Sequence, residues 1–372
     1  MCDDRPSVCH VTTVHTARDT RIFEKQCTSL ARSGYRVHLV APSCVDERLE
    51  GVELLGLSVH RSRLLRATLG QFSAVWRAWS VRASIYHFHD PELIAAAILL
   101  RLRGAAVVYD SHEDLESQVE CKRYLPEWSR WLTGRLANVL VRSWGLVANK
   151  VIAATPSISL LFPPNKTTIV QNFPPAPQGR PLEAERIRGA VCFVGGISID
   201  RGLANILEAL VVDEKLSVSL VLAGRFAFAN EELVARSHPA WHRVDFRGQV
   251  DRNQANEIMG SSRAGLLTYL PHRNHVESQP NKLFEYMAAG LPVIASDFPS
   301  WRHIVQSHRC GLLVDPNDPR AICEAIEWIV NNPLEAKEMG LRGRAAICSD
   351  LHWEAEFAKL DKVYRSVGLS AL

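Results

Sequence analysis

Residues 277–296 contain the pattern that most restricts the fold, namely a loop, a short amphipathic helix, a tight turn and a buried strand. Pro280 suits the first helical turn, because its missing N–H has no partner at that position. Apolar residues recur at a spacing of three to four: Leu283, Phe284, Met287 and Ala288. Gly290 allows a left-handed helix end, and Pro292 prevents the helix from continuing. Val293–Ala295 is then predicted to be a short buried strand.

The charges of this segment indicate a ligand. The start of a helix exposes unpaired N–H groups and the positive end of its dipole, and both favour phosphate. Glu277 lies just before the helix and Glu285 about two turns inside it. Since carboxylates accept hydrogen bonds from paired hydroxyls, the segment suits a ligand with both phosphate and sugar. The alternative is an ordinary strand–loop–helix unit with solvated glutamates.

The segment also resembles the signature of retaining glycosyltransferase family 4, whose members have the two-domain GT-B fold. The signature is a Glu, seven residues, a second Glu, a helix end of small residues and Gly-x-Pro-Val. The matching residues are Glu277, Glu285, Gly290, Pro292 and Val293. The usual Phe-Gly between the glutamates is replaced by Gln279-Pro280. Residues 280–287 are similar to a subgroup of surface polysaccharide and lipopolysaccharide biosynthesis.

Length and composition suit two globular domains of ordinary size. The chain has 372 residues, of which 47% are hydrophobic and 22% charged. We expect a cytoplasmic protein, because no apolar run is long enough to cross a bilayer and Met1–Arg5 lacks the features of a signal peptide. Nine cysteines without a C-x-x-C pair argue against a zinc or disulfide framework. A net charge of +3 argues against a nucleic-acid partner.

The order of predicted strands and helices indicates an α/β fold with parallel sheets. A strand at Ser7–Thr13, a helix at Ile22–Ser33 and a strand at Arg36–Ala41 form a βαβ unit. The alternation restarts with a strand at Ala190–Val194 and a helix at Leu203–Val212. The resemblance implies two Rossmann-like domains facing a cleft, with the acceptor on the first and the donor on the second. The predicted parts are residues 1–172, a Pro-rich linker at 173–188, residues 189–350, and a helix at 351–372 that returns to the first domain.

In the first half, loops at the carboxyl ends of strands are candidates for the acceptor side. The loop before the first helix carries Asp19 and Arg21. Asp19 suits a helix cap, whereas Arg21 could reach a phosphate or an acceptor group. The family carries a His against the donor sugar where this chain has His112, although a plain loop histidine is the alternative. His87 and His89 alternate along one predicted strand with no evident further ligand, so we expect no metal site there.

In the second half, the resemblance implies a donor site. Gly195-Gly196 follows the first strand, but Gly196 stands where the family usually has an Arg on the diphosphate, and Arg201 stands at the position of the usual Lys. Arg225 could compensate for the missing cation. The other implied donor contacts are Gln249 and Val250 beside the base, Asn281, Lys282 and Leu283 at the helix start, Glu285 on the ribose and Glu277 on the sugar. Glu277, His112 and Arg201 are the expected catalytic residues.

Two stretches without acidic residues combine arginine and tryptophan, at 61–82 and 128–150. In the first, apolar residues fall on one helical stripe: Leu65, Leu69, Phe72, Trp76 and Trp79. One interpretation is an amphipathic helix whose apolar side fills the core. The other is a surface helix that docks on anionic lipid, with tryptophan at the headgroup level. The second interpretation would place the protein on the inner face of the cell membrane.

These patterns predict a metal-independent retaining glycosyltransferase of the hexosyltransferase type, with no cofactor other than its nucleotide-sugar donor. The acceptor would be a glycan, often lipid-linked in this subgroup. A GT-B sugar-nucleotide epimerase and a non-catalytic nucleotide-sugar-binding protein are the alternatives. The sequence does not identify the base, the sugar, the acceptor, the linkage or the oligomeric state.

Overall fold

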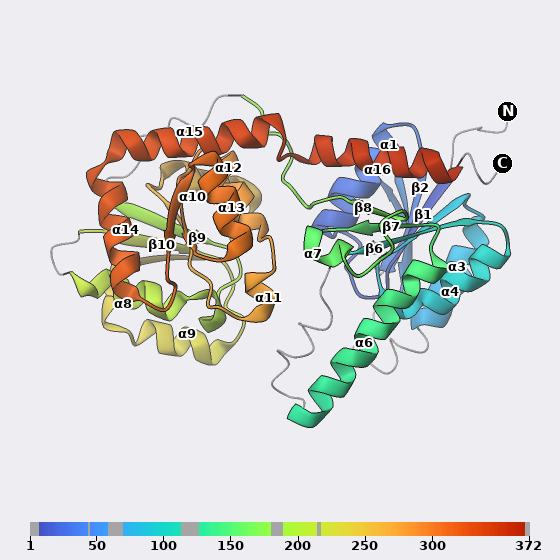
Figure 1. Cartoon of the computed structure of the whole chain (residues 1–372), viewed down its shortest axis with the longest axis horizontal. Helices are drawn as coiled ribbons and strands as arrows, with labels where there is room; N and C mark the ends of the chain where they lie inside the picture. The colour runs from blue at the N-terminus through green and yellow to red at the C-terminus, as the bar shows by residue number, and fades with distance from the viewer. Residues whose placement is uncertain are drawn as a thin grey trace. The chain divides into compact units, whose positions relative to one another are not determined.

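The computed structural model describes residues 7–43, 45–58, 70–112, 126–179, 189–213 and 217–368. The chain divides into two compact units, each built around a mainly parallel sheet (Figure 1). Unit 1 consists of Met1–Asn172 and Trp353–Leu372, and unit 2 consists of Phe173–His352. The prediction of two α/β parallel-sheet domains is therefore confirmed.

The sheet of unit 1 has eight strands in the order β3-β4-β2-β1-β5-β6-β7-β8. Its strands are β1 (Ser7–Val11), β2 (Arg36–Pro42), β3 (Glu47–Leu49), β4 (Val52–Leu57), β5 (Ile85–Phe88), β6 (Ala106–Ser111), β7 (Lys150–Ala153) and β8 (Thr167–Ile169). Only the edge strand β3 is antiparallel to its neighbour. The direction of strand succession reverses between β1 and β5, so loops at the carboxyl ends of these strands border a crevice.

Helices cover both faces of this sheet. One face packs on η1 (Thr20–Cys27), α1 (Thr28–Arg32) and α16 (Trp353–Gly368). The other packs on α3 (Gln71–Val81), α4 (Ile94–Leu102), α6 (Glu127–Val147) and α7 (Pro156–Ser159), with a 3₁₀ turn η3 (Pro91–Leu93) before α4. Alternate residues of β1 belong to the two cores, Val8 to one and Cys9 to the other, as expected of a strand buried on both faces.

Unit 2 has a six-stranded parallel sheet in the order β11-β10-β9-β12-β13-β14. Its strands are β9 (Ala190–Val194), β10 (Ser219–Ala223), β11 (Val244–Gly248), β12 (Gly265–Leu267), β13 (Val293–Ser296) and β14 (Gly311–Val314). Its helices are η4 (Ile199–Arg201), α8 (Leu203–Val212), α9 (Ala229–Arg236), η5 (Pro239–Arg243), α10 (Arg252–Ser261), α11 (Arg273–Val276), α12 (Asn281–Ala288), α13 (Pro299–His308), α14 (Pro319–Asn331) and α15 (Pro333–Ser349). Here the order reverses between β9 and β12.

Two local predictions are corrected. The predicted helix at Ile22–Ser33 begins as the π-helix η1, which turns Arg21, Lys25 and Gln26 into the interior, and only its last turn is α-helical. The hairpin of β3 and β4 was missed, because its residues 47–57 are rich in charge and carry no clean alternation of apolar and polar residues.

Candidate functional site

In unit 2, the loops after β9 and β12 meet where the strand order reverses. The amide of Leu270 donates to the carbonyl of Asp200 at 2.9 Å, which joins the two loops. Gly202 has a positive φ of 81°, and a Cβ there would lie 1.9 Å from the carbonyl oxygen of Thr268. Only glycine therefore allows the β9 loop to approach β12 this closely.

The Gly195-Gly196 turn lies under two cations. Nη1 of Arg201 donates to the carbonyl of Gly196 at 2.6 Å, and a Cβ on Gly196 would lie 2.5 Å from the same Nη1. A Cβ on Gly195 would lie 3.1 Å from Cε of Lys282. The guanidinium of Arg201 also stacks over the ring of Tyr269 at 5.5 Å. Small residues in the turn thus leave room for an arginine and a lysine that come from different elements.

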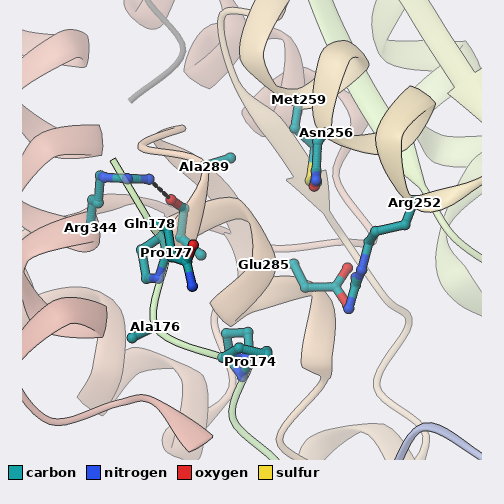
Figure 2. Close-up of a pocket in the computed structure, with 12 residues that line it drawn as sticks. Pro174, Ala176, Pro177, Gln178, Arg252, Asn256, Met259, Glu285, Ala289 and Arg344 are labelled. Carbon is teal, nitrogen blue, oxygen red and sulfur yellow. Dashed lines mark hydrogen bonds and ion pairs between the residues drawn. The ribbon is translucent and has the colours of Figure 1, made fainter. Parts of the chain in front are cut away.

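Lys282 belongs to the first turn of α12, the helix that also carries Glu285. Nζ of Lys282 bonds to Oε2 of Glu285, and Nη1 of Arg252 on α10 lies 3.1 Å from Oε1. Burial raises the pKa of Glu285, but the two cations lower it more, so the net pKa lies below its ordinary value. Figure 2 shows Arg252 reaching from α10 toward Glu285. A charged carboxylate with two displaceable partners suits paired hydroxyl donors.

Buried contacts fix α12 against the sheet. The hydroxyl of Tyr286 accepts from the amide of Val194 at 3.0 Å, which ties the helix to the end of β9. A Cβ on Gly265 would lie 2.5 Å from the Tyr286 ring, so the glycine of β12 makes space for it. Leu283, Phe284 and Met287 complete the buried side of α12. The start of the helix is therefore held rigidly beside the Gly195-Gly196 turn.

Glu285 also borders a pocket of about 320 Å³, which Ala288 and Ala289 at the end of α12 line as well (Figure 2). The extended residues 174–178 form one wall, and α10, α12 and Arg344 form the others. Arg344 is largely buried and donates to the carbonyls of Ala288 and Gly179. Because both of these acceptors are backbone groups, Arg344 fastens the extended segment to α12.

In unit 1, a buried ion pair occupies the carboxyl edge of the sheet. Nε and Nη2 of Arg21 donate to the two oxygens of Asp110 at 2.9 and 2.7 Å, and Gln26 donates to the same carboxylate at 2.8 Å. Asp110 is fully buried and Arg21 is 4% exposed. Burial raises the pKa of Asp110, but Arg21 and the nearby His89 lower it more, so it lies well below the ordinary value.

Three imidazoles lie beside this pair. His10 and His87 are register partners on β1 and β5, and His89 follows on the same face. The hydroxyl of Tyr364, from α16, lies 2.5 Å from Nδ1 of His87 and 3.3 Å from Nε2 of His10. Burial lowers the pKa of each imidazole, to about 3 for His89. All three rings are therefore neutral at pH 7.

His112 lies above this network, next to His15. Their Nε2 atoms are 3.1 Å apart, and Nδ1 of His112 lies 3.3 Å from the carbonyl of Asp110. His15 also lies 3.5 Å from Asp19 and 3.8 Å from Asp90. Asp90 in turn accepts hydrogen bonds from the β1 loop, including the Thr12 hydroxyl at 3.0 Å. The two imidazoles are half-buried, at the carboxyl ends of β1 and β6.

Two family models match the chain. The one described as "Glycosyl transferase 4-like domain" matches residues 20–162, and the one described as "Glycosyl transferases group 1" matches residues 184–346. Together they span most of both units. The chain belongs to the GT4-like glycosyltransferases.

Relatives of this glycosyltransferase include a phosphatidyl-myo-inositol mannosyltransferase of Mycobacterium leprae, 26% identical over 79% of this chain and 77% of the relative. They also include the D-rhamnosyltransferase WbpZ of Pseudomonas aeruginosa, 25% identical over 87% of this chain and 86% of the relative. Among solved structures, sucrose-phosphate synthase of Thermosynechococcus elongatus covers 98% of this chain and 100% of its own, with a TM-score of 0.77 and 18% identity. The likeness to the solved structure agrees with the GT-B fold.

The structure brings part of the predicted donor set of this glycosyltransferase together. Gly195, Gly196, Arg201, Asn281, Lys282 and Glu285 surround the start of α12, and Leu283 lies buried behind it. Gln249 and Val250 follow β11, whose last residue, Gly248, accepts from the amide of Gly224 at 2.7 Å. Arg225 is exposed beside this contact. Glu277 is 49% exposed at the end of α11, 3.8 Å from Arg273.

The predicted acceptor residues require correction. Asp19 caps η1 by accepting from the amides of Arg21 and Ile22, so its capping role is observed. Arg21 points into the interior toward Asp110, which leaves its guanidinium unable to reach an acceptor from this position. Sequence reasoning also missed His10, Tyr364 and Arg252. His10 could have been found, because it lies on the predicted first strand next to the strand of His87.

Proposed function

We propose that this glycosyltransferase transfers a hexose from a nucleotide-diphosphate sugar to a glycan acceptor with retention of anomeric configuration, in the synthesis of a cell-surface polysaccharide. The observation that carries the proposal is the convergence of the Gly195-Gly196 turn, Arg201, Lys282 and Glu285 at the start of α12. The helix start and the two cations would neutralise the diphosphate as it leaves, and Glu285 would accept from the ribose hydroxyls.

In this proposal Glu277 and His112 contact the donor sugar. Their roles follow from the family resemblance, and their side chains are 49% exposed for Glu277 and 12% exposed for His112. No protein nucleophile is needed if the departing phosphate takes the proton of the acceptor hydroxyl. Arg225, Gln249 and Val250 would border the nucleotide.

The donor is tested by a thermal-shift screen of UDP-, GDP-, ADP- and TDP-sugars, followed by product analysis with candidate glycan acceptors. We expect one nucleotide sugar to stabilise unit 2 and to release its nucleotide only when an acceptor is present. Interconversion of sugar nucleotides without an acceptor would indicate an epimerase. Binding without any turnover would indicate a nucleotide-sugar-binding protein.

We expect the transfer step itself to need no metal, because the sequence has no Asp-x-Asp motif and the donor site offers Arg201 and Lys282 to the diphosphate. Turnover should survive brief exposure to EDTA. Loss of turnover that Mg²⁺ or Mn²⁺ restores would contradict this expectation.

A surface of unit 1 supports a lipid-linked acceptor. The aromatic residues of α3 point outward, with Phe72 74% and Trp76 67% exposed, while Ala74 and Ala78 are buried. For Phe72, Trp76 and Trp79 the interpretation as core is therefore wrong, whereas Leu65 and Leu69 lie outside the described residues. The exposed apolar residues of α4 and α6 are Ile98, Leu99, Leu102, Trp131, Leu132, Leu136, Val139 and Leu146. We call the outer faces of α3, α4 and α6 the apolar face (Figure 1).

The three helices adjoin, because Arg103 at the end of α4 stacks on Trp79 of α3, and Arg101 donates to the carbonyl of Val147 in α6. Apart from Glu127, the charged residues of α3, α4 and α6 are arginines, of which Arg77 pairs with Asp46 at 2.8 Å. A large apolar surface with a basic rim fits the headgroup region of an anionic membrane. None of the helices in the described part of the chain could cross a bilayer.

Co-sedimentation with anionic vesicles at low salt tests this surface. We expect Phe72→Ser/Trp76→Ser to lower the bound fraction, because these side chains would enter the headgroup region. The matched control is Leu233→Ser/Val234→Ser, which removes two apolar side chains of similar exposure, 71% and 64%, from α9 of unit 2. If the wild type ignores the vesicles, or if both double variants bind equally, the apolar face does not dock on membrane. Arg63 and Arg66 of the stretch 61–82 lie outside the described residues.

A further inference from the structure

The three buried imidazoles of unit 1 each have a ring nitrogen close to a ring nitrogen of the other two. Suitable nitrogens of His10, His87 and His89 all lie within 4.8 Å of one another. Nδ1 of His10 and Nε2 of His89 are 3.0 Å apart. The ring centroids are separated by 4.7 Å for His10 and His87, 5.2 Å for His10 and His89, and 4.7 Å for His87 and His89. Parallel pairing of β1 with β5 produces this arrangement, since it places His10 beside His87.

The second nitrogen of every ring faces an oxygen. Nε2 of His10 and Nδ1 of His87 bond to the hydroxyl of Tyr364. Nδ1 of His89 lies 3.3 Å from Oδ2 of Asp110, which is within ion-pair distance but does not meet hydrogen-bond geometry. Metal-binding histidines in proteins are oriented in this way, with an oxygen on the nitrogen that does not bind the metal. The arrangement leaves Nδ1 of His10, Nε2 of His87 and Nε2 of His89 for an ion.

The environment of Nε2 of His87 also indicates a missing ligand. Within the described residues it has no hydrogen-bond partner, although His87 is fully buried. An unpartnered buried nitrogen destabilises the folded unit, and a bound cation would remove this cost. Burial also lowers the pKa of the three rings, which keeps them in the neutral form that binds metals.

We propose that His10, His87 and His89 form a site for a divalent zinc-like cation in the interior of unit 1. Three imidazole ligands suit Zn²⁺ better than Mg²⁺ or Ca²⁺, which prefer oxygen ligands. Tetrahedral Zn²⁺ with Zn–N distances of about 2.0–2.1 Å requires nitrogens about 3.3 Å apart. The pair of His10 and His89 already has this spacing within 0.3 Å.

A neighbouring group, His89 with Asp110 and His112, is less suitable. Its ligand atoms are equally close, but Asp110 already accepts two hydrogen bonds from Arg21 and one from Gln26. A cation there would face the guanidinium of Arg21 across the same carboxylate. A cation at His10, His87 and His89 would join β1 to β5. Through Tyr364, which bonds to two of the rings, it would also join both strands to α16. In this proposal the cation takes no part in the sugar transfer.

Zinc content of the full-length protein tests the proposal. The protein is produced without a histidine tag in zinc-supplemented medium, dialysed, and assayed by elemental mass spectrometry and by zinc release on denaturation. We expect one zinc per chain. Substitution with Co²⁺ should give the visible absorption bands of tetrahedral cobalt. Since α16 closes the site, Co²⁺ is introduced during refolding or growth.

Variants identify the ligands. His87→Gln should lower zinc affinity more than a hundredfold, and Tyr364→Phe, which removes the oxygen that orients two rings, about 10–100-fold. His38→Gln is the matched control, because His38 also lies on a strand of this sheet but outside the cluster. Wild-type protein without zinc and without cobalt bands would overturn the proposal, as would full zinc binding by a folded His87→Gln. Should His87→Gln fail to fold, the wild-type metal analysis and Tyr364→Phe still decide.

Discussion

The carboxyl edges of the two sheets differ in how deeply their charged side chains are buried. In unit 1, Asp110 is fully buried and its partner Arg21 is 4% exposed, with three neutral imidazoles beside them. In unit 2, the side chain of Glu285 keeps 15% of its exposure, and those of its partners Lys282 and Arg252 keep 23% and 53%. Glycines, not buried charges, line the unit 2 edge, at positions 195, 196 and 202.

The difference in burial distinguishes ion pairs that stabilise the fold, as in unit 1, from ion pairs whose members can bind a ligand, as in unit 2. A buried charge without its partner is costly, so Arg21 and Asp110 are bound to each other in every state of the folded unit. A half-exposed pair contributes little to stability, and its members can exchange one partner for another. We therefore expect unit 1 to respond to changes in this cluster through stability, and unit 2 to respond to changes at Glu285 through ligand affinity.

Acidification should give the largest difference between the units. The pKa values of His10, His87 and His89 are lowered by burial, so below the ordinary value of 6.5 the unfolded chain binds protons that the folded unit does not. Stability of unit 1 is then full above pH 6.5 and falls as the pH decreases, down to about 3 for His89. The loss should approach about 1.4 kcal/mol per pH unit for each imidazole that stays neutral in the folded unit.

Hydrogen exchange, read by peptide at pH 7 and pH 5 after correction for the intrinsic rate, checks this prediction. Peptides of β1, β5 and β6 should lose protection, whereas those of β9, β12 and β13 should keep it. Zinc at the three imidazoles would not change the sign, because a protonated ring cannot bind a metal. Equal loss in both units would show that the buried imidazoles do not set the acid sensitivity.

Replacing Asp110 by Asn should give the next largest effect. The shape is kept, but the guanidinium of Arg21 is left buried without a negative partner, which costs about 3–5 kcal/mol. Urea unfolding followed by exchange in unit 1 peptides measures this loss. The matched control is Asp297→Asn in unit 2, whose partner Arg302 lies at the surface, and it should unfold nearly as the wild type does. If the two variants are equally stable, the buried ion pair of unit 1 contributes no more to stability than a surface ion pair of unit 2.

The two edges also differ in how much of them the sequence could predict. The start of α12 is a local pattern: Pro280, Lys282, Glu285 and Gly290 lie within 11 residues, and helix geometry alone sets their spacing. Arg252, the second cation on Glu285, comes from another helix and was missed. The capping role of Asp251 is also predictable from local sequence, because the side chain of a cap bonds to an amide within the first turn of its own helix.

The cluster of unit 1 joins residues that are far apart in the chain. His10, Arg21, His89, Asp110 and Tyr364 come from β1, η1, the β5 loop, β6 and α16. Pairing of β1 with β5 was implied by the fold, but the turn of Arg21 into the interior depends on the π-helix, for which the sequence has no local signal. The outward orientation of Trp76 was ambiguous because an apolar stripe looks the same whether it meets a core or a membrane.

His112 is the residue through which the stable edge of unit 1 would take part in transfer. If it contacts the donor sugar, His112→Ala should lower kcat about a hundredfold, near the loss seen when one preorganised donor to a transition state is removed. Affinity for the bare nucleotide, measured by calorimetry, should stay within twofold of the wild type. Gln at the same position should recover part of kcat, because its amide can still bond to a hydroxyl. Equal losses of turnover and nucleotide affinity would indicate a structural histidine.

Glu285→Gln should give the smallest effect and the one confined to unit 2. The amide keeps the shape of the carboxylate but weakens the charge-assisted hydrogen bonds to the ribose, which costs about 1–3 kcal/mol of donor binding. Loss of the ion pairs with Lys282 and Arg252 should leave stability nearly unchanged, because both cations can turn to water. Calorimetry with the donor nucleotide measures the affinity, and urea unfolding of the same variant measures the free energy of unfolding. Arg252→Gln is the control, since it opens the same ion pair while keeping the carboxylate, and it should bind the nucleotide more tightly than Glu285→Gln does. Unchanged nucleotide affinity in Glu285→Gln, or a stability loss as large as that of Asp110→Asn, would mean that Glu285 supports the fold and that the contrast between the two edges is wrong.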